Sequence, residues 1–164
     1  MDDLVKRPPI GYTEARAAFD TLCEVLDGRG WQYDRNQNDL TLNVRVNGDD
    51  LFMELKVEFD PKRRHVYAVS PLPFGVPQDK RAEIACAVNM INCAILEGCF
   101  DFGYHNGMLV FRYVSSFRGS ILSKEMFERL LNIVFGTVDD YNDKLFLIMK
   151  GKMTLGELKN MIDA

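Results

Sequence analysis

Cysteine and histidine are the residue types in this chain that could form a catalytic or metal-binding site. A cysteine beside a histidine can act as a nucleophile, and clusters of the two bind zinc. The cysteines form no C-x-x-C pair, and neither His65 nor His105 has a second ligand at metal-binding spacing. Nor does the sequence contain a P-loop, a G-x-G-x-x-G or a G-x-S-x-G motif. We therefore expect no catalytic residue, no metal site and no cofactor.

Two other kinds of function stay open as alternatives. A small enzyme would need a cleft that joins groups distant in sequence, for example His65, Glu58 and a cysteine. A nucleic-acid-binding module would use the outer face of the predicted sheet, with Phe52 and Tyr67, together with the basic tip at 62–65. A net charge of −4 makes nucleic acid an unlikely partner.

Length and composition predict a single folded domain. The chain has 164 residues, of which 47% are hydrophobic and 27% charged, and this excludes intrinsic disorder. No run approaches the ~18 apolar residues of a membrane span, and the first residues are acidic, without the apolar segment of a secretory signal. We therefore expect a cytoplasmic protein with no membrane partner. Its four cysteines are expected to be reduced and buried.

The elements that must position any site follow from hydrophobic periodicity. Thr13 is expected to cap a first helix that ends near Gly28. Four alternating segments predict strands, at 31–35, 40–46, 51–59 and 64–70. Prolines at 71, 73 and 77 are expected to end this part of the sheet and lead into a helix over 78–97.

A hairpin closed by Asn106-Gly107 follows, then a helix over 123–150 capped by Ser123, and a short helix that begins at Thr154. The predicted hairpin registers pair residue 46 with 51, 59 with 64, and 105 with 108. We divide the chain into a loose lead-in (1–12), a single domain (13–150) and a short C-terminal helix (151–164). The order α-β-β-β-β-α-β-β-α-α, with short turns between strands, predicts an α+β fold with an antiparallel sheet of five or six strands.

The predicted helix over 78–97 is apolar on two opposite sides. Ile84, Val88, Ile91 and Ile95 form one stripe, which we assign to the core. The opposite side lacks the charges of an ordinary surface helix. Its residues are the candidate dimer or partner interface: Cys86, Asn89, Met90, Cys93 and Glu97. Either the long C-terminal helix covers this side, or two copies of the chain pack there about a two-fold axis.

Several short segments resemble the YbjN-like bacterial sensory transduction regulators. They are Pro71-Leu72-Pro73-Phe74, the run from Val76 to Arg81, Asn89-Met90-Ile91-Asn92, Gly98-Cys99-Phe100-Asp101 and Val110-Phe111-Arg112. The resemblance covers about residues 13 to 150. It implies a fold like that of type III secretion chaperones, which commonly dimerise and bind polypeptides, and it implies no enzymatic activity. The resemblance assigns no role to Asn89 and Asn92. Physically, they could satisfy backbone groups at the end of a strand or helix, or bond across an interface.

Together these observations predict a non-catalytic regulatory or chaperone-like protein. We expect it to form a homodimer and to bind a polypeptide partner, through an exposed strand edge or the outer sheet face.

Overall fold

The computed structural model of the protein describes residues 11–49 and 51–164. Its helices are α1 (Tyr12–Gly28), α2 (Arg81–Ala94), α3 (Lys124–Met149) and α4 (Leu155–Ile162), with a 3-10 turn, η1 (Gln78–Lys80), before α2. Its strands are β1 (Tyr33–Asn36), β2 (Thr41–Asn47), β3 (Phe52–Asp60), β4 (His65–Gly75), β5 (Cys99–Gly103) and β6 (Met108–Ser116). The predicted order of elements is confirmed. Residues 1–10 of the expected lead-in, and Asp50 of the expected turn at 47–50, lie outside the described residues.

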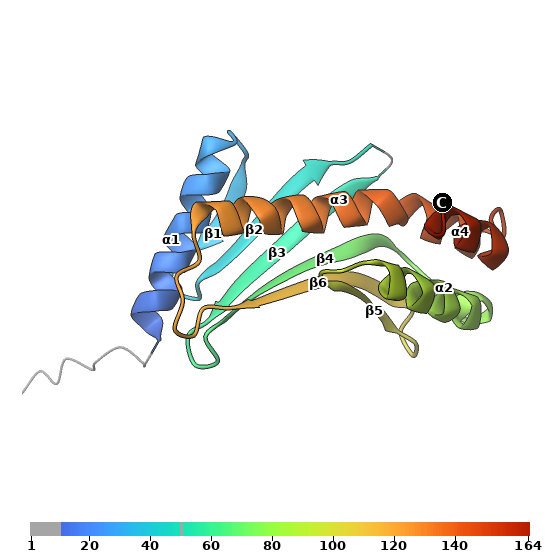
Figure 1. Cartoon of the computed structure of the whole chain (residues 1–164), viewed down its shortest axis with the longest axis horizontal. Coiled ribbons are helices and arrows are strands. Elements are labelled where there is room, and N and C mark those ends of the chain that lie inside the picture. Colours follow the sequence, from blue (N-terminus) through green and yellow to red (C-terminus); the bar gives the residue numbers. More distant parts are fainter. Residues whose placement is uncertain (1–10, 50) are drawn as a thin grey trace, which may run out of the picture.

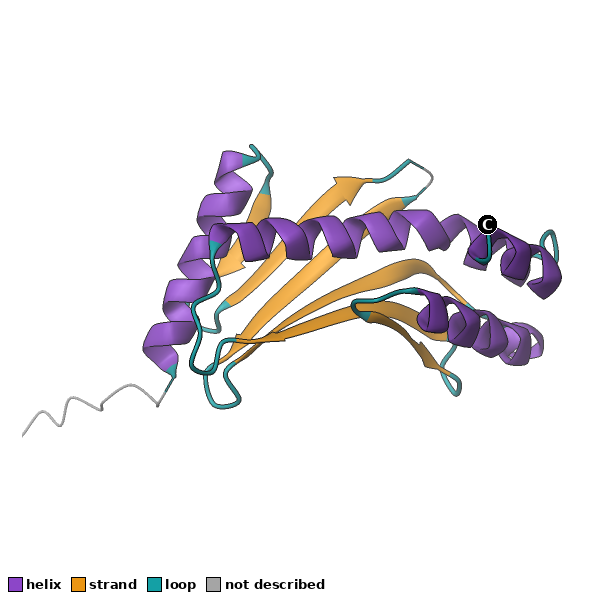
Figure 2. Cartoon of the chain, viewed as in Figure 1, coloured by secondary structure: helices purple, strands orange, loops and turns teal. Residues whose placement is uncertain are grey.

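The strands of the described chain form one antiparallel sheet of six, in the order β1-β2-β3-β4-β6-β5. The long helix α3 crosses the sheet (Figure 1). Helix α1 packs near the N-terminal end of α3, and α2 and α4 lie together at the C-terminal end of α3. Figure 2 shows the sheet behind the long helix. The α+β class is therefore confirmed.

One face of the sheet meets the helices and the other does not. Along the central strands β3 and β4, buried residues alternate with exposed or half-buried ones. This is the pattern of an antiparallel sheet with a single core-facing side. Aromatic rings fill much of the core, and Phe59 contacts both Phe19 of α1 and Phe127 of α3. The largest fully buried side chains include Phe19, Phe59, Phe100, Phe111, Phe117 and Phe127.

Each predicted hairpin register is wrong by two residues. Val44 pairs with Leu55 instead of Met53, and Phe59 pairs with Val66 instead of Arg64. In the last hairpin Gly103 pairs with Met108, so the turn spans 104–107 and is longer than the predicted Asn106-Gly107. A shift of two keeps every side chain on its predicted face, because side chains alternate with a period of two. The inward sets therefore remain apolar.

Strand β4 continues through the prolines that were expected to end it. Its pairing with β3 stops at Val69, whereas its pairing with β6 reaches Pro71 and resumes at Gly75 after an irregularity. Pro71 and Pro73 thus lie where β4 has no neighbour on the β3 side. A proline lacks the N–H that a neighbouring strand would need, so it is tolerated at such an edge.

Two of the three predicted helix caps are confirmed. The Ser123 hydroxyl accepts a hydrogen bond from Met126 N (3.3 Å), and Thr154 and Glu157 form the expected capping box. Thr13, in contrast, lies inside α1, whose N-cap is Gly11 with φ 90°. A Cβ at Gly11 would lie 2.3 Å from the Pro61 carbonyl oxygen. The close approach of the β3–β4 turn therefore requires glycine here, and the helix begins directly after it.

Candidate functional site

Helix α2 is shorter than the sequence predicted. It begins at Arg81, after the 3-10 turn, and ends at Ala94 because Ile95 has extended backbone (φ −80°, ψ 145°). Glu97 therefore lies outside the helix. Its carboxylate accepts a hydrogen bond from Arg129 of α3 (2.7 Å), so this member of the predicted interface is directed to α3 instead of the α2 surface.

Asn92 explains how the end of α2 is attached to the sheet. Its Nδ2 donates to the Phe100 carbonyl oxygen (2.9 Å), and its Oδ1 accepts from the Phe100 backbone N–H (2.8 Å). Phe100 lies on β5, an edge strand of the sheet. An edge strand leaves alternate backbone groups unpaired, and the amide of Asn92 satisfies one such pair. For Asn92, the expected role of satisfying strand backbone groups is confirmed.

The two sides of α2 are covered to different degrees. Ile84, Val88 and Ile91 are buried as predicted, and Ile95 is half-buried against the core. On the other side α4 packs against the helix, and Met90 is half-buried. The expected cover was the long helix α3, which contacts α2, but it is α4 that faces Asn89, Met90 and Cys93 across a groove. This side of α2 is therefore covered only in part.

The uncovered part of α2 is an uncharged stripe. Ala82, Cys86, Asn89 and Cys93 are exposed and follow one another at spacings of four, three and four residues. We call these four residues the α2 stripe. The expectation that the cysteines are buried holds for Cys23 but is wrong for Cys86, Cys93 and the half-buried Cys99. The Asn89 side chain makes no hydrogen bond within the described part of the chain, unlike that of Asn92.

A groove lies between α2 and α4, beside the stripe. Its volume is about 610 Å³, and Asn89, Met90 and Cys93 line one wall. Lys159, Ile162 and Asp163 line the other wall. Three of the five predicted interface residues therefore meet at one groove. The contribution of α4 was missed, although its apolar spacing of Leu155, Leu158 and Ile162 indicates a face that needs a partner.

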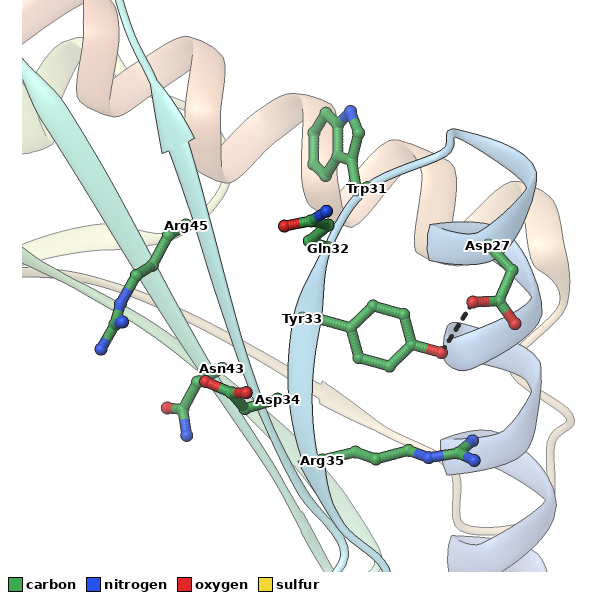
Figure 3. A pocket seen from close by; sticks show the side chains of 8 residues that line it. All are labelled: Asp27, Trp31, Gln32, Tyr33, Asp34, Arg35, Asn43 and Arg45. Atoms are coloured by element: carbon green, nitrogen blue, oxygen red, sulfur yellow. Dashed lines mark hydrogen bonds between the residues drawn. The ribbon is translucent and has the colours of Figure 1, made fainter.

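A second cleft follows the other edge of the sheet, beside β1. It has a volume of about 640 Å³ and is lined by β1, the neighbouring β2 and the end of α1. Figure 3 shows Tyr33 and Arg35 directed toward α1, with the Tyr33 hydroxyl bonded to Asp27 (2.9 Å). Burial and this hydrogen bond raise the pKa of Tyr33. The cleft-lining side chains were not predicted to form a site, although a strand at 31–35 was expected.

The backbone of β1 remains open along this cleft. Three of its four residues are exposed, and it pairs only with β2 within the described chain. Every second residue of such an edge presents its N–H and C=O outward. The two edges of the sheet thus differ, because Asn92 occupies one outward pair on β5 and no side chain takes this position on β1 in the described structure.

The outer sheet face carries a small polar cluster instead of a catalytic one. Arg112 donates to Asp101 (2.5 Å) and to the Cys99 sulfur (3.2 Å). The hydrogen bond from Arg112 lowers the pKa of Asp101. Burial and the charge of Asp101 raise the pKa of the Cys99 thiol, which disfavours the reactive thiolate.

The enzyme alternative would require a cysteine beside His65 and Glu58, and the structure does not bring Cys99 there. Cys99 is level with Arg112 and His65 with Ser116, a separation of roughly 13 Å along β6 at ~3.3 Å per residue. No group of three or more metal-ligating side chains gathers in the described residues. At the basic tip, Arg63 bonds to Asp60 (3.0 Å) and Arg64 lies 3.8 Å from Glu14, so both charges are partly neutralised.

Among residues 11–49 and 51–164, none of the helices combines the length and the apolar character needed to cross a bilayer.

Comparisons with known proteins agree with this architecture. Residues 18–147 match the sequence model of the YbjN family, described as "Putative bacterial sensory transduction regulator". A similar solved structure is that of YbjN from E. coli, "a putative transcription regulator", with a TM-score of 0.54 and 15% identity. The similarity covers 83% of this chain and 92% of that one. None of the curated proteins compared with the sequence matches it. Helix α4 lies beyond the residues that match the family.

Proposed function

The chain belongs to the YbjN family, and on that premise we propose that it is a non-catalytic regulatory or chaperone-like protein that dimerises and binds a polypeptide. The observation that carries the dimer is the α2 stripe, an exposed helix surface with no charge. Small uncharged side chains at a 4-3-4 spacing allow a second helix to pack closely. The cytoplasmic location expected from the sequence stays a prediction.

The stripe defines a specific geometry for the dimer. Cys86 and Cys93 lie seven residues apart on one face of α2, on either side of Asn89 and Met90. A two-fold axis through that midpoint would cross two α2 helices in antiparallel fashion. Cys86 would then lie opposite Cys93 of the partner subunit, and this would occur twice in each dimer.

Disulfide cross-linking tests this geometry. The full chain, with Cys99→Ser to remove the half-buried thiol, is oxidised with copper–phenanthroline, and its mass is measured by gel electrophoresis without reductant. We expect a covalent dimer that is lost in both the Cys86→Ser and the Cys93→Ser variant. Light scattering on the unoxidised protein should give twice the mass of the chain. A monomeric mass would overturn the dimer, and cross-links that persist in both single variants would overturn the antiparallel crossing.

The Met90→Glu variant provides a second test. The new carboxylate would lie beside the stripe, and a charge buried between two helices is strongly unfavourable. We expect a monomer or an aggregate by size-exclusion chromatography with light scattering. An unchanged dimer mass with an unchanged circular dichroism spectrum would count against the stripe as the interface.

The open edge of β1 supports the polypeptide-binding part of the proposal. An extended peptide can add a strand to an exposed sheet edge through main-chain hydrogen bonds. At β5 such a peptide would have to displace Asn92 from Phe100, whereas at β1 it would enter the cleft beside Tyr33 and Asp34. We therefore assign peptide binding to β1.

Proline substitution in β1 separates binding from stability. Consecutive residues of an edge strand alternate between N–H groups bonded to the neighbour and N–H groups directed outward. One of the two variants Asp34→Pro and Arg35→Pro therefore removes an N–H that bonds to β2, and it lowers stability. The other removes only an N–H that is directed away from β2 and is free to bond to a peptide. Peptides selected from a random phage-displayed library should lose at least tenfold in affinity for the second variant at unchanged stability. No selected peptides, or equal affinity for that variant, would contradict the assignment.

A further inference from the structure

We infer that α4 forms part of the dimer interface, so that a second copy of the chain packs across α2 and α4 together and fills the groove between them. This inference rests on the proposed function, because it requires the dimer. It adds to that proposal a segment, Leu155–Ile162, that lies beyond the residues matching the family.

The first argument is the area that a dimer needs. With 14 residues, α2 is about 21 Å long at ~1.5 Å per residue. A strip ~10 Å wide along it presents roughly 200 Å² in projection, and even twice this value is well below the ~800 Å² that each partner buries in a standard interface. The α2 stripe alone is therefore too small, and a stable dimer has to include neighbouring surface.

The second argument is that α4 supplies surface continuous with the stripe. Asn89 and Cys93 belong both to the stripe and to one wall of the groove, whose other wall is formed by Ile162 and its neighbours on α4. A second copy seated on the stripe would thus meet α4 without any movement of the chain.

The third argument is that α4 is held in place. Leu158 is fully buried, and the capping box fixes the start of the helix through bonds from Thr154 N to Glu157 (2.7 Å) and from Glu157 N to Thr154 (3.2 Å). A helix that is already ordered loses little conformational entropy when a partner binds. It can therefore act as a preformed part of the interface.

Concentration-dependent hydrogen exchange of the unmodified chain tests the inference. Amides of α2 and α4 are followed by mass spectrometry at a series of protein concentrations that spans dissociation. We expect both helices to gain protection over the same concentrations. If α2 gains protection and α4 does not, the inference on α4 is wrong while the proposed dimer stands. If neither helix gains protection, the proposed dimer itself fails.

A matched pair of variants gives an independent measurement. Ile162→Glu places a charge in the groove, whereas Asn160→Glu places the same charge on an exposed position of α4 outside it. By sedimentation equilibrium, Ile162→Glu should raise the dimer dissociation constant at least tenfold, and Asn160→Glu should change it less than twofold. If Ile162→Glu releases α4 from the domain, the interface still loses this surface and the dimer weakens. A dimer that is unchanged or tighter in Ile162→Glu would overturn the inference.

Discussion

At the scale of single residues, two asparagines three positions apart on α2 have opposite environments. Asn92 makes two hydrogen bonds to the backbone of Phe100, whereas Asn89 is exposed on the α2 stripe. Their sequence context is nearly the same, and the difference comes from the side of the helix on which each lies. A pair of this kind lets one position serve as the control for the other.

Asn92→Ala should lower the free energy of unfolding by about 1–3 kcal/mol, because it leaves a backbone N–H and a C=O of β5 without partners. Asn89→Ala should change it by less than about 0.5 kcal/mol. Urea unfolding, measured below the concentration at which dimers form, checks both values. Equal effects of the two substitutions would mean that the hydrogen bonds to Phe100 do not stabilise the protein.

Asn142 is the most unusual polar residue of the core. It lies on α3, is fully buried, and neither its Oδ1 nor its Nδ2 has a hydrogen-bond partner in the described structure. A buried amide without partners costs about 1–3 kcal/mol. Asn142→Leu, which has the same number of side-chain heavy atoms and the same branch at Cγ but is apolar, should therefore raise the melting temperature.

Asn142→Ala is the control for this prediction, because it removes the amide but leaves a cavity and should stabilise less than leucine does. Lower stability of Asn142→Leu than of the parent protein would show that the amide is satisfied in solution.

At the scale of elements, the hairpins show what alternation can and cannot predict. The inward residues Val44, Leu55 and Val66 were assigned to the correct face, because burial on one side of a sheet is a strong constraint. The exact partners were wrong, because turns of different length give registers that differ by two and bury the same residues. In the last hairpin Gly103 accepts hydrogen bonds from Asn106 and Gly107, and these close a turn longer than the dipeptide signal indicated.

Helix α4 should respond to acid through its capping box. The hydrogen bonds from the backbone and side chain of Thr154 lower the pKa of Glu157. A carboxylate with a lowered pKa in the folded state stabilises the fold above its unfolded pKa, ~4.3, and this contribution is lost as the pH falls through the lowered value. Below pH ~4 we therefore expect less protection from hydrogen exchange at the start of α4, measured by NMR as the exchange rate relative to the intrinsic rate at each pH.

The Glu157→Gln variant tests the origin of this response, because glutamine can accept the same hydrogen bonds but does not titrate. The protection of its α4 amides, relative to the intrinsic exchange rate at each pH, should not change over the same pH range. If α4 of the variant loses protection in acid as the parent protein does, the response comes from another titrating group.

At the scale of the whole molecule, the four cysteines report on different regions of the fold. Cys23 is in the core, Cys99 is on the outer face of the sheet with a raised pKa, and Cys86 and Cys93 are on the α2 stripe. At low protein concentration Cys86 and Cys93 should react first with a disulfide reagent, Cys99 more slowly, and Cys23 only on unfolding.

Raising the protein concentration should slow the reaction of Cys86 and Cys93 but not that of Cys99, because the proposed dimer covers α2 and α4 but not the outer face of the sheet. The Asp101→Asn variant should react faster at Cys99, since removing the negative charge lowers the pKa of the thiol. Mass spectrometry of the labelled peptides measures each rate. Equal slowing of all exposed thiols would contradict an interface on α2.

The class of fold was predictable, whereas the surroundings of the candidate site were predictable only in part. Strand alternation and the caps at Ser123 and Thr154 were sufficient for the order of elements. Helix α2 was recognised from the sequence as unusual, because the side opposite its core stripe lacks charged residues. Its end at Ala94 was not predicted, because the change to extended backbone at Ile95 has no proline or glycine directly after Ala94 to mark it. Its contact with α4 was not predicted, because it depends on Ile162, which is distant in sequence. Local patterns contain no information about such pairings.

The two hydrogen bonds from Asn92 to Phe100 also have a mechanical consequence. Asn92 lies on α2, the helix with the exposed stripe, and its side chain is hydrogen-bonded to the edge strand β5. If a second subunit bound at the stripe and rotated α2, these two hydrogen bonds would pass part of the movement to β5.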